Sequence, residues 1–329
     1  MKVTDFQPIL DMISAARDGR ILVVTHERPD GDAVGSAAGL RLLLQENGCT
    51  ADVLFPDDLP DAYRGFVPED MLTSVADFSG YALVLSVDAS TPKRTGLGAG
   101  IMPDRITGPF AALDHHPDHI EFAQVTYLDP AACSAAEIVF RLAQTAGWNI
   151  SPAAATCLLL GVVTDTGGFR FDNTSPRALQ AAAELMSVGA DHHRVMDRAY
   201  FSKPFNMAQF EAELFCRGLR TALEGRFAWF LLTKDLMDKY NINIRNTENL
   251  IENIRGIDGV VVAALVKPCA APGMFKISLR SKDPAISVGN VARRLNGGGH
   301  EMAAGGTICA RTAEQAEEIL LKHVAMEMK

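Results

Sequence analysis

Short apolar runs alternate with helix-period segments along the first half of the chain. Four of these runs predict buried strands, at residues 20–25, 51–55, 82–87 and 109–113. Segments with helical periodicity follow, at residues 32–45, 134–147, 152–163 and 176–188. Because strands that alternate with helices pair in parallel, this half predicts an α/β fold with a mostly parallel, doubly wound sheet.

A second alternation begins near residue 225. Strand patterns occupy residues 227–232, 260–266 and 275–279, and helical patterns occupy residues 249–255, 284–295 and 313–328. Between the halves, residues 204–223 have the apolar spacing of a long amphipathic connector. We therefore predict a first domain at residues 1–195, a helical connector at 196–224 and a second, smaller α/β domain at 225–329.

The composition is that of an ordinary globular protein, with 48% hydrophobic and 22% charged residues, which excludes a disordered or fibrous chain. Residues 1–20 lack an uninterrupted apolar core, and no apolar run is long enough to span a bilayer. The six cysteines are scattered singly without a C-x-x-C pair, which suits reduced thiols rather than a zinc knuckle. We expect a cytoplasmic protein with no membrane partner. The oligomeric state stays open, a homodimer included.

Acidic residues outnumber basic residues by 40 to 31, so the formal net charge is −9. Such a chain is poorly suited to coat long duplex DNA, because duplex binding depends on clustered cations that neutralise phosphates. A short anionic ligand can still bind where a few cations or metal ions are placed locally. The charge is therefore compatible with short RNA or a nucleotide as the partner.

The densest chemistry lies in the segment Thr25-His-Glu-Arg-Pro-Asp-Gly-Asp32, between the first predicted strand and the first predicted helix. Its proline and glycine favour a tight, non-helical loop, which His26, Asp30 and Asp32 share. Asp32 taken alone is also compatible with a helix N-cap. Three ligand-type side chains in one short loop indicate a site instead.

Further ligand-type residues follow two other predicted strands and end an apolar helix. They are Asp88, Asp114, His115, His116 and Asp165. In open parallel sheets, ligands bind at the carboxyl ends of the strands. All of these residues therefore fall where the predicted fold places a ligand site.

Crowded carboxylates require counter-charge. Asp30, Asp32, Asp88 and Asp165 together carry four negative charges, which at close range raise one another's pKa or push the site apart. Two divalent cations cancel that charge, and carboxylate and imidazole ligands without thiolates favour Mn²⁺, with Mg²⁺ or Co²⁺ as alternatives. Two metals that share a carboxylate commonly promote in-line attack on phosphorus. The sequence therefore favours a two-metal phosphoryl hydrolase.

Two histidine-containing features favour a purely structural interpretation. Asp191-His192-His193 repeats the tripeptide Asp-His-His but follows a helix end, which predicts a solvated turn and helix start without metal. His119 lies in a polar loop, where we expect a surface histidine, with a substrate contact as the alternative.

At these residues the chain resembles the DHH phosphoesterase superfamily, whose namesake matches Asp114-His115-His116. The supporting motifs are His26-x-x-x-Asp30-x-Asp32, Asp88 and Asp165. In the second half, Asn296-Gly-Gly-Gly-His-Glu-Met-Ala-Ala-Gly305 resembles the glycine-rich signature of the DHHA1 domain, and Ser278-Leu-Arg-Ser281 resembles its preceding strand. The ordered set covers nearly the whole chain, which makes the resemblance specific.

The resemblance implies a role for each residue of the first domain. One Mn²⁺ would be held by His26 and Asp30 and the other by Asp32, His115 and Asp165, with Asp88 as the bridge. A metal-bridging hydroxide would be the nucleophile, since two-metal sites acidify bound water toward a pKa of roughly 7. His116 would bind or polarise the scissile phosphate, and Asp114 would orient a histidine or the loop.

For the second domain, the resemblance implies substrate binding by Arg280, Ser281, Gly297, Gly298, Gly299 and His300. The glycines would let backbone N–H groups approach a phosphate, and Arg280 and His300 would add donors and positive charge. An active-site cleft between the two domains would measure the length of the substrate. Asn296 stands where the family often has a further glycine, which leaves the substrate preference open.

Two compact domains without an appended module resemble the nano-RNase and 3′-phosphoadenosine 5′-phosphate (PAP) phosphatase group of this family. The resemblance therefore implies a manganese-dependent hydrolase that converts short oligoribonucleotides to mononucleotides and PAP to AMP. The alternatives are a phosphodiesterase for cyclic or linear dinucleotides, an inorganic pyrophosphatase or exopolyphosphatase, and a nucleotide-binding protein without catalysis.

Overall fold

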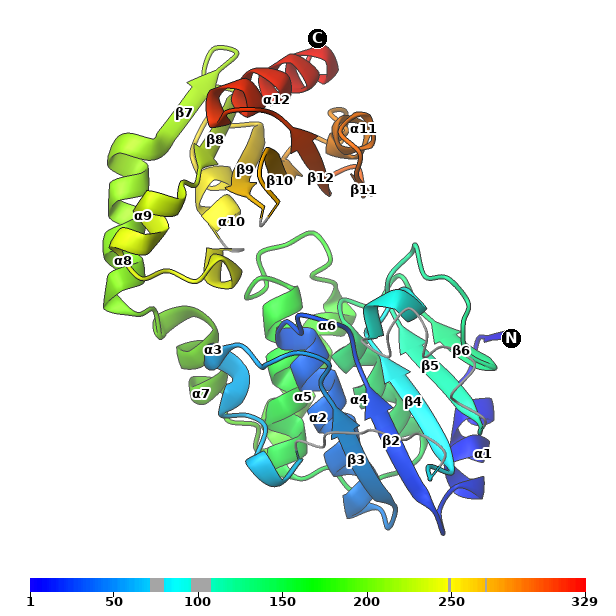
Figure 1. Ribbon diagram of the computed structural model, residues 1–329. Helices are drawn as coiled ribbons and strands as arrows, with labels where there is room; N and C mark the ends of the chain where they lie inside the picture. The colour runs from blue at the N-terminus through cyan, green and yellow to red at the C-terminus, as the bar shows by residue number, and fades with distance from the viewer. Residues whose placement is uncertain (72–79, 96–107, 248–249, 270) are drawn as a thin grey trace. The chain divides into compact units, whose positions relative to one another are not determined.

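The computed structural model describes residues 1–71, 80–95, 108–247, 250–269 and 271–329 (Figure 1). Two compact units make up the chain, Met1–Ser202 and Lys203–Lys329. The boundary between these units falls inside the segment 196–224 that the sequence assigns to a connector. Each unit has a six-stranded sheet of its own.

The first unit contains a parallel sheet, which confirms the predicted α/β fold. Its strands are β1 (Lys2–Val3), β2 (Arg20–Val24), β3 (Thr50–Leu54), β4 (Leu83–Val87), β5 (Phe110–Asp114) and β6 (Val125–Leu128). They lie in the order β1-β6-β5-β4-β2-β3, and neighbouring strands pair in parallel. Because β3 and β4 lie on opposite sides of β2, the strand order reverses beside β2. The carboxyl ends of β2 and β4 are therefore the place where such a sheet binds a ligand.

The central strands of this sheet are buried on both faces. In β2, Ile21 and Val23 belong to the large core, whereas Leu22 and Val24 belong to a smaller cluster on the opposite face. A strand buried on both sides has no solvent face to fill with polar residues. This burial explains why the strands read as continuous apolar runs in the sequence.

Helices contribute most of the large core in the first unit. They are α1 (Gln7–Ala15), α2 (Gly31–Glu46), α3 (Asp61–Arg64), α4 (Ala135–Thr145), α5 (Pro152–Asp165), α6 (Pro176–Val188) and α7 (His192–Met196), with shorter turns at Glu69–Met71, Pro92–Thr95 and Asp197–Phe201. Proline opens α5 and α6 at the first turn, where its missing N–H costs nothing.

Glycines let α2 and α5 pack closely. A Cβ atom on Gly35 would lie 2.4 Å from the carbonyl oxygen of Cys157, and one on Gly39 would lie 2.6 Å from the side chain of Leu158. A Cβ atom on Gly161 of α5 would lie 2.4 Å from the carboxylate of Asp32 in α2. This close approach fixes the distance between the first turn of α2 and the last turn of α5.

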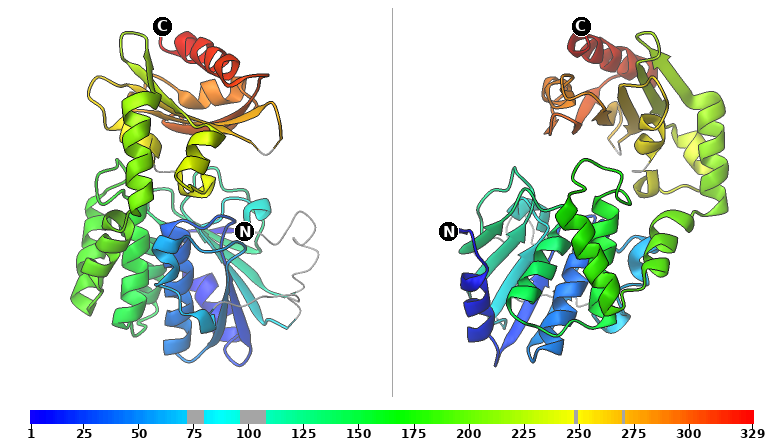
Figure 2. Two further views of the ribbon diagram at one scale, coloured as in Figure 1. Left: turned by 60° about the vertical axis from the view of Figure 1, so that its left-hand side comes forward. Right: turned by 180° about the vertical axis from the view of Figure 1, so that it is seen from behind.

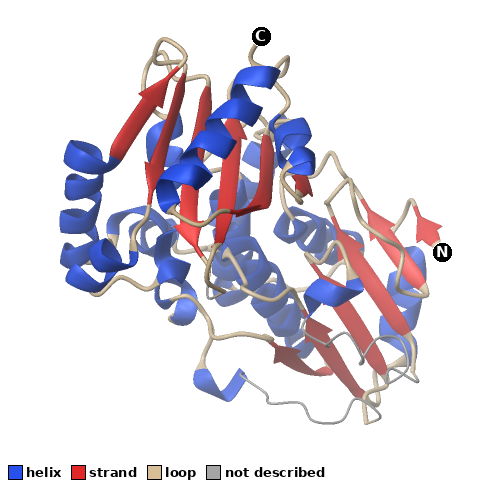
Figure 3. Cartoon of the chain, turned by 45° about the horizontal axis from the view of Figure 1, so that its top comes forward, coloured by secondary structure: helices blue, strands red, loops and turns tan. Residues whose placement is uncertain are grey.

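The second unit contains a mixed sheet (Figure 3). Its strands are β7 (Leu219–Ala222), β8 (Phe227–Leu231), β9 (Val262–Pro268), β10 (Met274–Ser281), β11 (Gly298–Gly299) and β12 (Ala303–Cys309), in the order β11-β12-β10-β9-β8-β7. β8 pairs with β9 in parallel, and the other neighbours are antiparallel.

Helices cover both faces of this second sheet (Figure 2). They are α8 (Phe205–Glu213), α9 (Lys234–Lys239), α10 (Leu250–Arg255), α11 (Val288–Arg294) and α12 (Ala313–Glu327), with turns at Leu214–Gly218 and Ile244–Thr247. Residues of α11 and α12 pack with Val262 and Val266 of β9, whereas residues of α8, α9 and α10 pack with Ala263 and Leu265 of the same strand. Alternate residues of β9 thus pack into two separate cores, one on each face of the sheet.

The structure differs from the predicted elements in several places. The segment 204–223 is not one helix, because α8 ends in a π-helical turn and the chain then forms the edge strand β7. The sequence prediction also lacks α1, β6 and β12. The predicted helix at 249–255 corresponds to α10, and Asn249 lies outside the described residues. In the described part of the chain, no helix combines the length and apolar character needed to cross a membrane.

Candidate metal centre

The loop after β2 holds the first group of predicted ligands. Asp30 is the N-cap of α2, and its Oδ1 accepts hydrogen bonds from the backbone N–H groups of Asp32 (3.1 Å) and Ala33 (3.0 Å). The N-cap is therefore Asp30 and not Asp32. His26 lies in the same loop, with its side chain only 3% exposed and its Nε2 3.8 Å from Oδ1 of Asp30.

The carboxylate of Asp32 is held by the N-terminus of α4. Its Oδ2 accepts from the N–H of Ala135 at 2.6 Å, and its Oδ1 accepts from the N–H of Ala136 at 3.0 Å. Helix N-termini favour negative charge because their first N–H groups lack intrahelical partners. Ser134 caps this helix by accepting from the N–H of Glu137. The helix thus fixes the orientation of a fully buried carboxylate.

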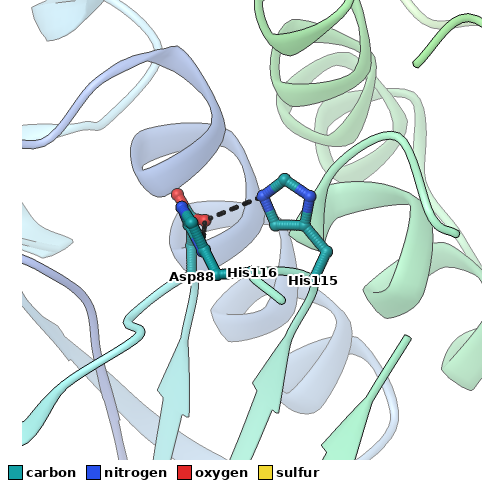
Figure 4. A group of neighbouring side chains, drawn as sticks. All are labelled: Asp88, His115 and His116. Atoms are coloured by element: carbon teal, nitrogen blue, oxygen red, sulfur yellow. Dashed lines mark ion pairs between the residues drawn. The ribbon is translucent and has the colours of Figure 1, made fainter. Parts of the chain in front are cut away.

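Asp88 directly follows β4 and forms ion pairs with His115 and His116 (Figure 4). Its Oδ2 is 3.5 Å from Nε2 of His26, and its Oδ1 is 3.4 Å from Nε2 of His115 and 3.6 Å from Nδ1 of His116. The backbone of Asp88 has a φ of +57°, in the left-handed region that L-residues seldom occupy. Such strained positions concentrate at functional sites.

The predicted ligands assemble into two groups that Asp88 connects. His26, Asp30 and Asp88 form one group, and Asp32, His115 and Asp165 form the other, with the ligand atoms of each group within 4.8 Å of one another. Nε2 of His115 is 3.9 Å from Asp32 and 3.6 Å from Asp165. A third group, which overlaps both others at the centre, consists of Asp88, His115 and His116.

The carboxylates of this centre are buried and close enough to raise one another's pKa. Burial raises the pKa of Asp32, and the charges of Asp88 and Asp165 raise it further. Burial and the nearby carboxylates of Asp30 and Asp88 raise the pKa of Asp165 to about 7, against the opposing effect of His115. These shifts are the expected response of carboxylates that are buried close to one another.

The charge of these carboxylates raises the pKa of the neighbouring histidines. Burial lowers the pKa of His26, but the contact with Asp88 and the charge of Asp30 outweigh it and raise the pKa to about 9. The pKa of His115 is likewise raised, against burial, by Asp88, Asp165 and Asp32. Oδ1 of Asp88 is buried and accepts no hydrogen bond from the described residues. This donor set therefore fits divalent cations, which would replace the histidine protons and give Asp88 a partner.

Asp114 contacts His115, His116 and His119 through the two oxygens of its carboxylate. Its Oδ1 accepts from the N–H groups of His115 (2.8 Å) and His116 (3.3 Å) and lies 2.8 Å from Nδ1 of His116. Its Oδ2 lies 2.5 Å from Nδ1 of His119. Burial raises the pKa of Asp114, but the contacts with His116 and His119 outweigh it and lower the pKa.

The prediction that His119 is a surface histidine is wrong. Its side chain is 0% exposed and stacks on Phe122, with ring centroids 5.2 Å apart. The N–H of His119 also bonds the carbonyl of His116 at 3.1 Å, which turns the chain back toward Asp114. The polar sequence of this loop does not indicate a buried histidine, because its partner, Asp114, lies at the end of the preceding strand. In contrast, Asp191 caps α7 with exposed His192 and His193, as expected for a helix start.

The second unit holds Arg280 on β10 beside an acidic partner. Nε of Arg280 is 2.9 Å from Oε1 of Glu252, and Oε2 of Glu252 is 3.2 Å from Nη1 of Arg255. The side chain of Arg280 is about one third exposed. Ser281 is 1% exposed, and its hydroxyl donates to the carbonyl of Asp283 and accepts from the N–H of Asp283. The side chain of Ser281 therefore shapes this turn, and the predicted role of Ser281 in substrate binding stays a prediction.

The glycine-rich segment forms a hairpin with β12. A Cβ atom on Gly297 would lie 2.0 Å from the carbonyl oxygen of Gly305, so this approach requires glycine. Gly299 has a φ of +132°, and Asn296 has a φ of +51°, a conformation that glycine and asparagine tolerate best. Asn296 therefore preserves the backbone path. Gly298 has open space around it, and His300 is exposed.

The sequence prediction missed the backbone donors of Ala135 and Ala136, as well as Gly161. The capping box Ser134-x-x-Glu137 could have located the N-terminus of α4 and so pointed to an anion site there. No sequence signal identifies Asp32 as its occupant, because residues 32 and 135 are joined only by the fold.

Comparisons with known families agree with this geometry. The family described as "DHH family, N-terminal domain" matches residues 20–162, and the DHHA1 domain matches residues 230–329. The first match covers strands β2 to β6 with His26, Asp30, Asp32, Asp88 and Asp114-His115-His116, and the second covers β9 to β12. The chain belongs to the DHH family.

Relatives match over most of the chain. The bifunctional oligoribonuclease and PAP phosphatase NrnA of Thermus thermophilus is 30% identical over 315 residues, which cover 95% of this chain and 91% of the relative. The protein of the same name from Bacillus subtilis is 27% identical, with 91% and 92% covered. An exopolyphosphatase-related protein from Bacteroides fragilis has a similar structure, with a TM-score of 0.88, 25% identity and 98% and 97% of the two chains covered.

Proposed function

We propose that this protein is a manganese-dependent phosphoesterase that hydrolyses short oligoribonucleotides to mononucleotides and PAP to AMP. The family and the relatives support a hydrolase of phosphate esters. Relatives named as oligoribonuclease and PAP phosphatase cover more than nine tenths of this chain, which supports the substrate class. The six free cysteines suit a reducing compartment, in keeping with a cytoplasmic enzyme.

The observation that carries the proposal is the position of Asp88. A buried carboxylate with one oxygen toward His26 and the other toward His115 connects two groups of ligand atoms. A carboxylate shared in this way is the usual bridge of two-metal phosphoryl hydrolases. We therefore assign one cation to His26 and Asp30, the other to Asp32, His115 and Asp165, and Asp88 to both.

Two bound cations would supply Lewis acidity at the phosphoryl oxygens and activate water near neutral pH. Carboxylate-rich sites with imidazole suit Mn²⁺, and Mg²⁺ and Co²⁺ are the alternatives. No thiol lies within the three ligand groups, which argues against a thiolate-bound zinc among the described residues.

His116 is the proposed contact to the scissile phosphate. Asp114 engages its Nδ1, so Nε2 is the ring nitrogen that remains for a substrate oxygen. Burial lowers the pKa of His116, but Asp114 and Asp88 outweigh it and raise the pKa, which favours the protonated ring. A protonated ring donates a charge-assisted hydrogen bond to phosphate and offsets its charge. Asp114 acts by orienting this ring.

In the second unit we propose Arg280 and His300 as phosphate contacts. Arg280 offers a guanidinium that Glu252 holds in place, and His300 extends from the exposed glycine hairpin. The N–H groups of Gly297 and His300 already bond the carbonyls of Ala292 and Ala303. The contribution of Gly298 and Gly299 is therefore the close approach that their missing side chains allow.

A product time course tests the function. Purified protein with Mn²⁺ is offered an RNA dinucleotide, a long single-stranded RNA, PAP and cyclic di-AMP in parallel, with Asp88→Asn as the inactive control. We expect rapid loss of the dinucleotide and of PAP, with little loss of the long RNA. If both of the preferred substrates stay intact, the proposal is wrong, and faster turnover of cyclic di-AMP would replace it with a cyclic dinucleotide phosphodiesterase.

A further inference from the structure

One side chain outside the ligand set joins the two segments that hold Asp32 and Asp165. Nδ2 of Asn173 donates to the carbonyl oxygen of Asp165 at 3.1 Å and to that of Cys133 at 3.0 Å. The two carbonyls lie 8 and 40 residues away in sequence. Both acceptors are carbonyls, so the amide nitrogen must face them, and both of its hydrogens are used.

Each of these carbonyls belongs to a segment that presents a predicted metal ligand. Asp165 is the last residue of α5, and its carboxylate is 3.6 Å from Nε2 of His115. Cys133 directly precedes Ser134, the N-cap of α4, whose first N–H groups bind both oxygens of Asp32. Asn173 therefore sets the end of α5 against the start of α4.

The other end of this connection is also fixed. The N–H of Cys133 donates to Oε2 of Glu137 at 2.8 Å, and the fully buried Glu137 forms an ion pair with Arg177 of α6. Cys133 is thus held at its N–H by Glu137 and at its carbonyl by Asn173. The amide of Asn173 thus connects the carbonyl of this segment directly to the carbonyl of Asp165.

We propose that Asn173 is a positioning residue for the ligand group of Asp32, His115 and Asp165, and that it sets the affinity of this group for its cation. The inference rests on the two-metal centre of the proposed function and adds that only one of its two cations depends on Asn173. The group of His26, Asp30 and Asp88 comes from the loops after β2 and β4, which Asn173 does not contact in the described structure. Loss of Asn173 should weaken one of the two cations and spare the other.

The chain contains a matched control for this contact. Nδ2 of Asn47, at the C-cap of α2, also donates to two carbonyls, those of Leu43 (2.8 Å) and Asn149 (3.1 Å). Asn47→Ala removes at least as many hydrogen bonds within the same unit, because Oδ1 of Asn47 also accepts from the N–H of Asn149 at 3.0 Å. It does so away from the ligand groups.

Mn²⁺ titration of metal-stripped protein tests the inference, by calorimetry and by electron paramagnetic resonance without substrate. We expect wild type and Asn47→Ala to bind two Mn²⁺ with a coupled-pair spectrum. We expect Asn173→Ala to bind one Mn²⁺ normally and the other about 10-fold more weakly or worse, as is usual when a supporting partner of a metal ligand is lost. The coupled spectrum should return with excess Mn²⁺.

The outcomes separate this inference from the proposed function. Two unchanged affinities in Asn173→Ala, or equal weakening of both cations, would overturn the inference and leave the metal centre intact. A wild-type protein that binds no pair of Mn²⁺ would overturn the metal centre and the inference together. Asn173→Ser, with a shorter reach to both carbonyls, replaces the alanine variant if circular dichroism shows that the latter does not fold.

Discussion

Nδ1 of His119 lies 2.5 Å from Oδ2 of Asp114, in a position without solvent access. The other oxygen of this carboxylate contacts Nδ1 of His116 at 2.8 Å. Both oxygens of Asp114 are therefore occupied, one by each histidine. The orientation of His116 depends on this division, because a carboxylate with only one fixed oxygen can rotate.

We predict that His119→Ala lowers kcat about 10-fold and leaves the Mn²⁺ content unchanged. The substitution leaves Oδ2 of Asp114 without a donor, so the carboxylate no longer fixes the ring of His116 against the substrate, and a loss of about 1.4 kcal/mol in the activation free energy corresponds to a factor of ten. His119→Asn keeps a donor and should recover part of kcat. Steady-state kinetics with metal analysis test this prediction, and an alanine variant with wild-type kcat would contradict it.

The two Asp-His-His tripeptides should differ in function. His115 contacts Asp88, Asp165 and Asp32, so His115→Ala should abolish activity and lower the bound Mn²⁺. His192 is exposed at the start of α7, so His192→Ala should leave both unchanged. Metal analysis of the two purified variants makes the comparison. Loss of Mn²⁺ from the His192 variant would show that the site assignment is wrong.

The metal-stripped protein should lose stability as the pH rises. The pKa of His26 is about 9 in the folded chain against 6.5 ordinarily, so its stabilisation is complete below pH 6.5 and is lost through pH 9. The pKa of Asp165 is raised from 3.8 to about 7, so its ionisation as the pH rises from 3.8 to about 7 also destabilises the folded protein. Both pKa shifts therefore lower the free energy of unfolding as the pH rises.

Thermal unfolding of chelator-treated protein across pH 6 to 9 measures this effect. We expect Tm to fall with pH, and the fall to be smaller with saturating Mn²⁺, because the cations bind the deprotonated ligands. The Asp165→Asn variant should lose the part of the slope that lies near pH 7. A Tm of the stripped protein that rises over this range would contradict the charge distribution described above.

Gly161 should not tolerate a methyl group. In a helix interior, Gly→Ala ordinarily stabilises by roughly 0.5–1 kcal/mol. Here the added Cβ would lie 2.4 Å from Oδ1 of Asp32 and 2.5 Å from Cβ of Ala136. We expect Gly161→Ala to destabilise by about 1–3 kcal/mol and to weaken Mn²⁺ binding, as overpacking against a ligand does both.

Denaturant unfolding and Mn²⁺ titration measure these two effects. Gly65→Ala is the control, because its Cβ would meet only the side chain of Arg194 at 3.8 Å, an ordinary contact. Equal stability of the two variants would show that α2 and α5 can separate without cost to the site.

The sequence predicts the strands that carry the ligands because β2, β4 and β5 are buried on both faces and so remain continuously apolar. It does not predict β12, whose Ala-Ala-Gly-Gly-Thr-Ile-Cys sequence has weak strand propensity and is held by pairing with β10 and β11. The ligand residues follow from one rule, the meeting of strand ends at the switch point. Their supports do not, since no residue pattern pairs Asp32 with the N-terminus of α4 or Asn173 with its two carbonyls.

Arg280 provides the test of the second unit in catalysis. Its guanidinium is about one third exposed and is held by Glu252, whose other oxygen pairs with Arg255. A hydrogen bond to a charged group contributes about 1.5–3 kcal/mol, so Arg280→Ala should raise KM about 10- to 100-fold. The kcat and the Mn²⁺ content should change little, because the ligand groups all belong to the first unit.

His300→Ala should give the same pattern, and Arg311→Ala, at an exposed position beyond β12, serves as the control for loss of surface charge. If KM is unchanged in both the Arg280 and His300 variants, the second unit does not contribute to substrate binding through these residues.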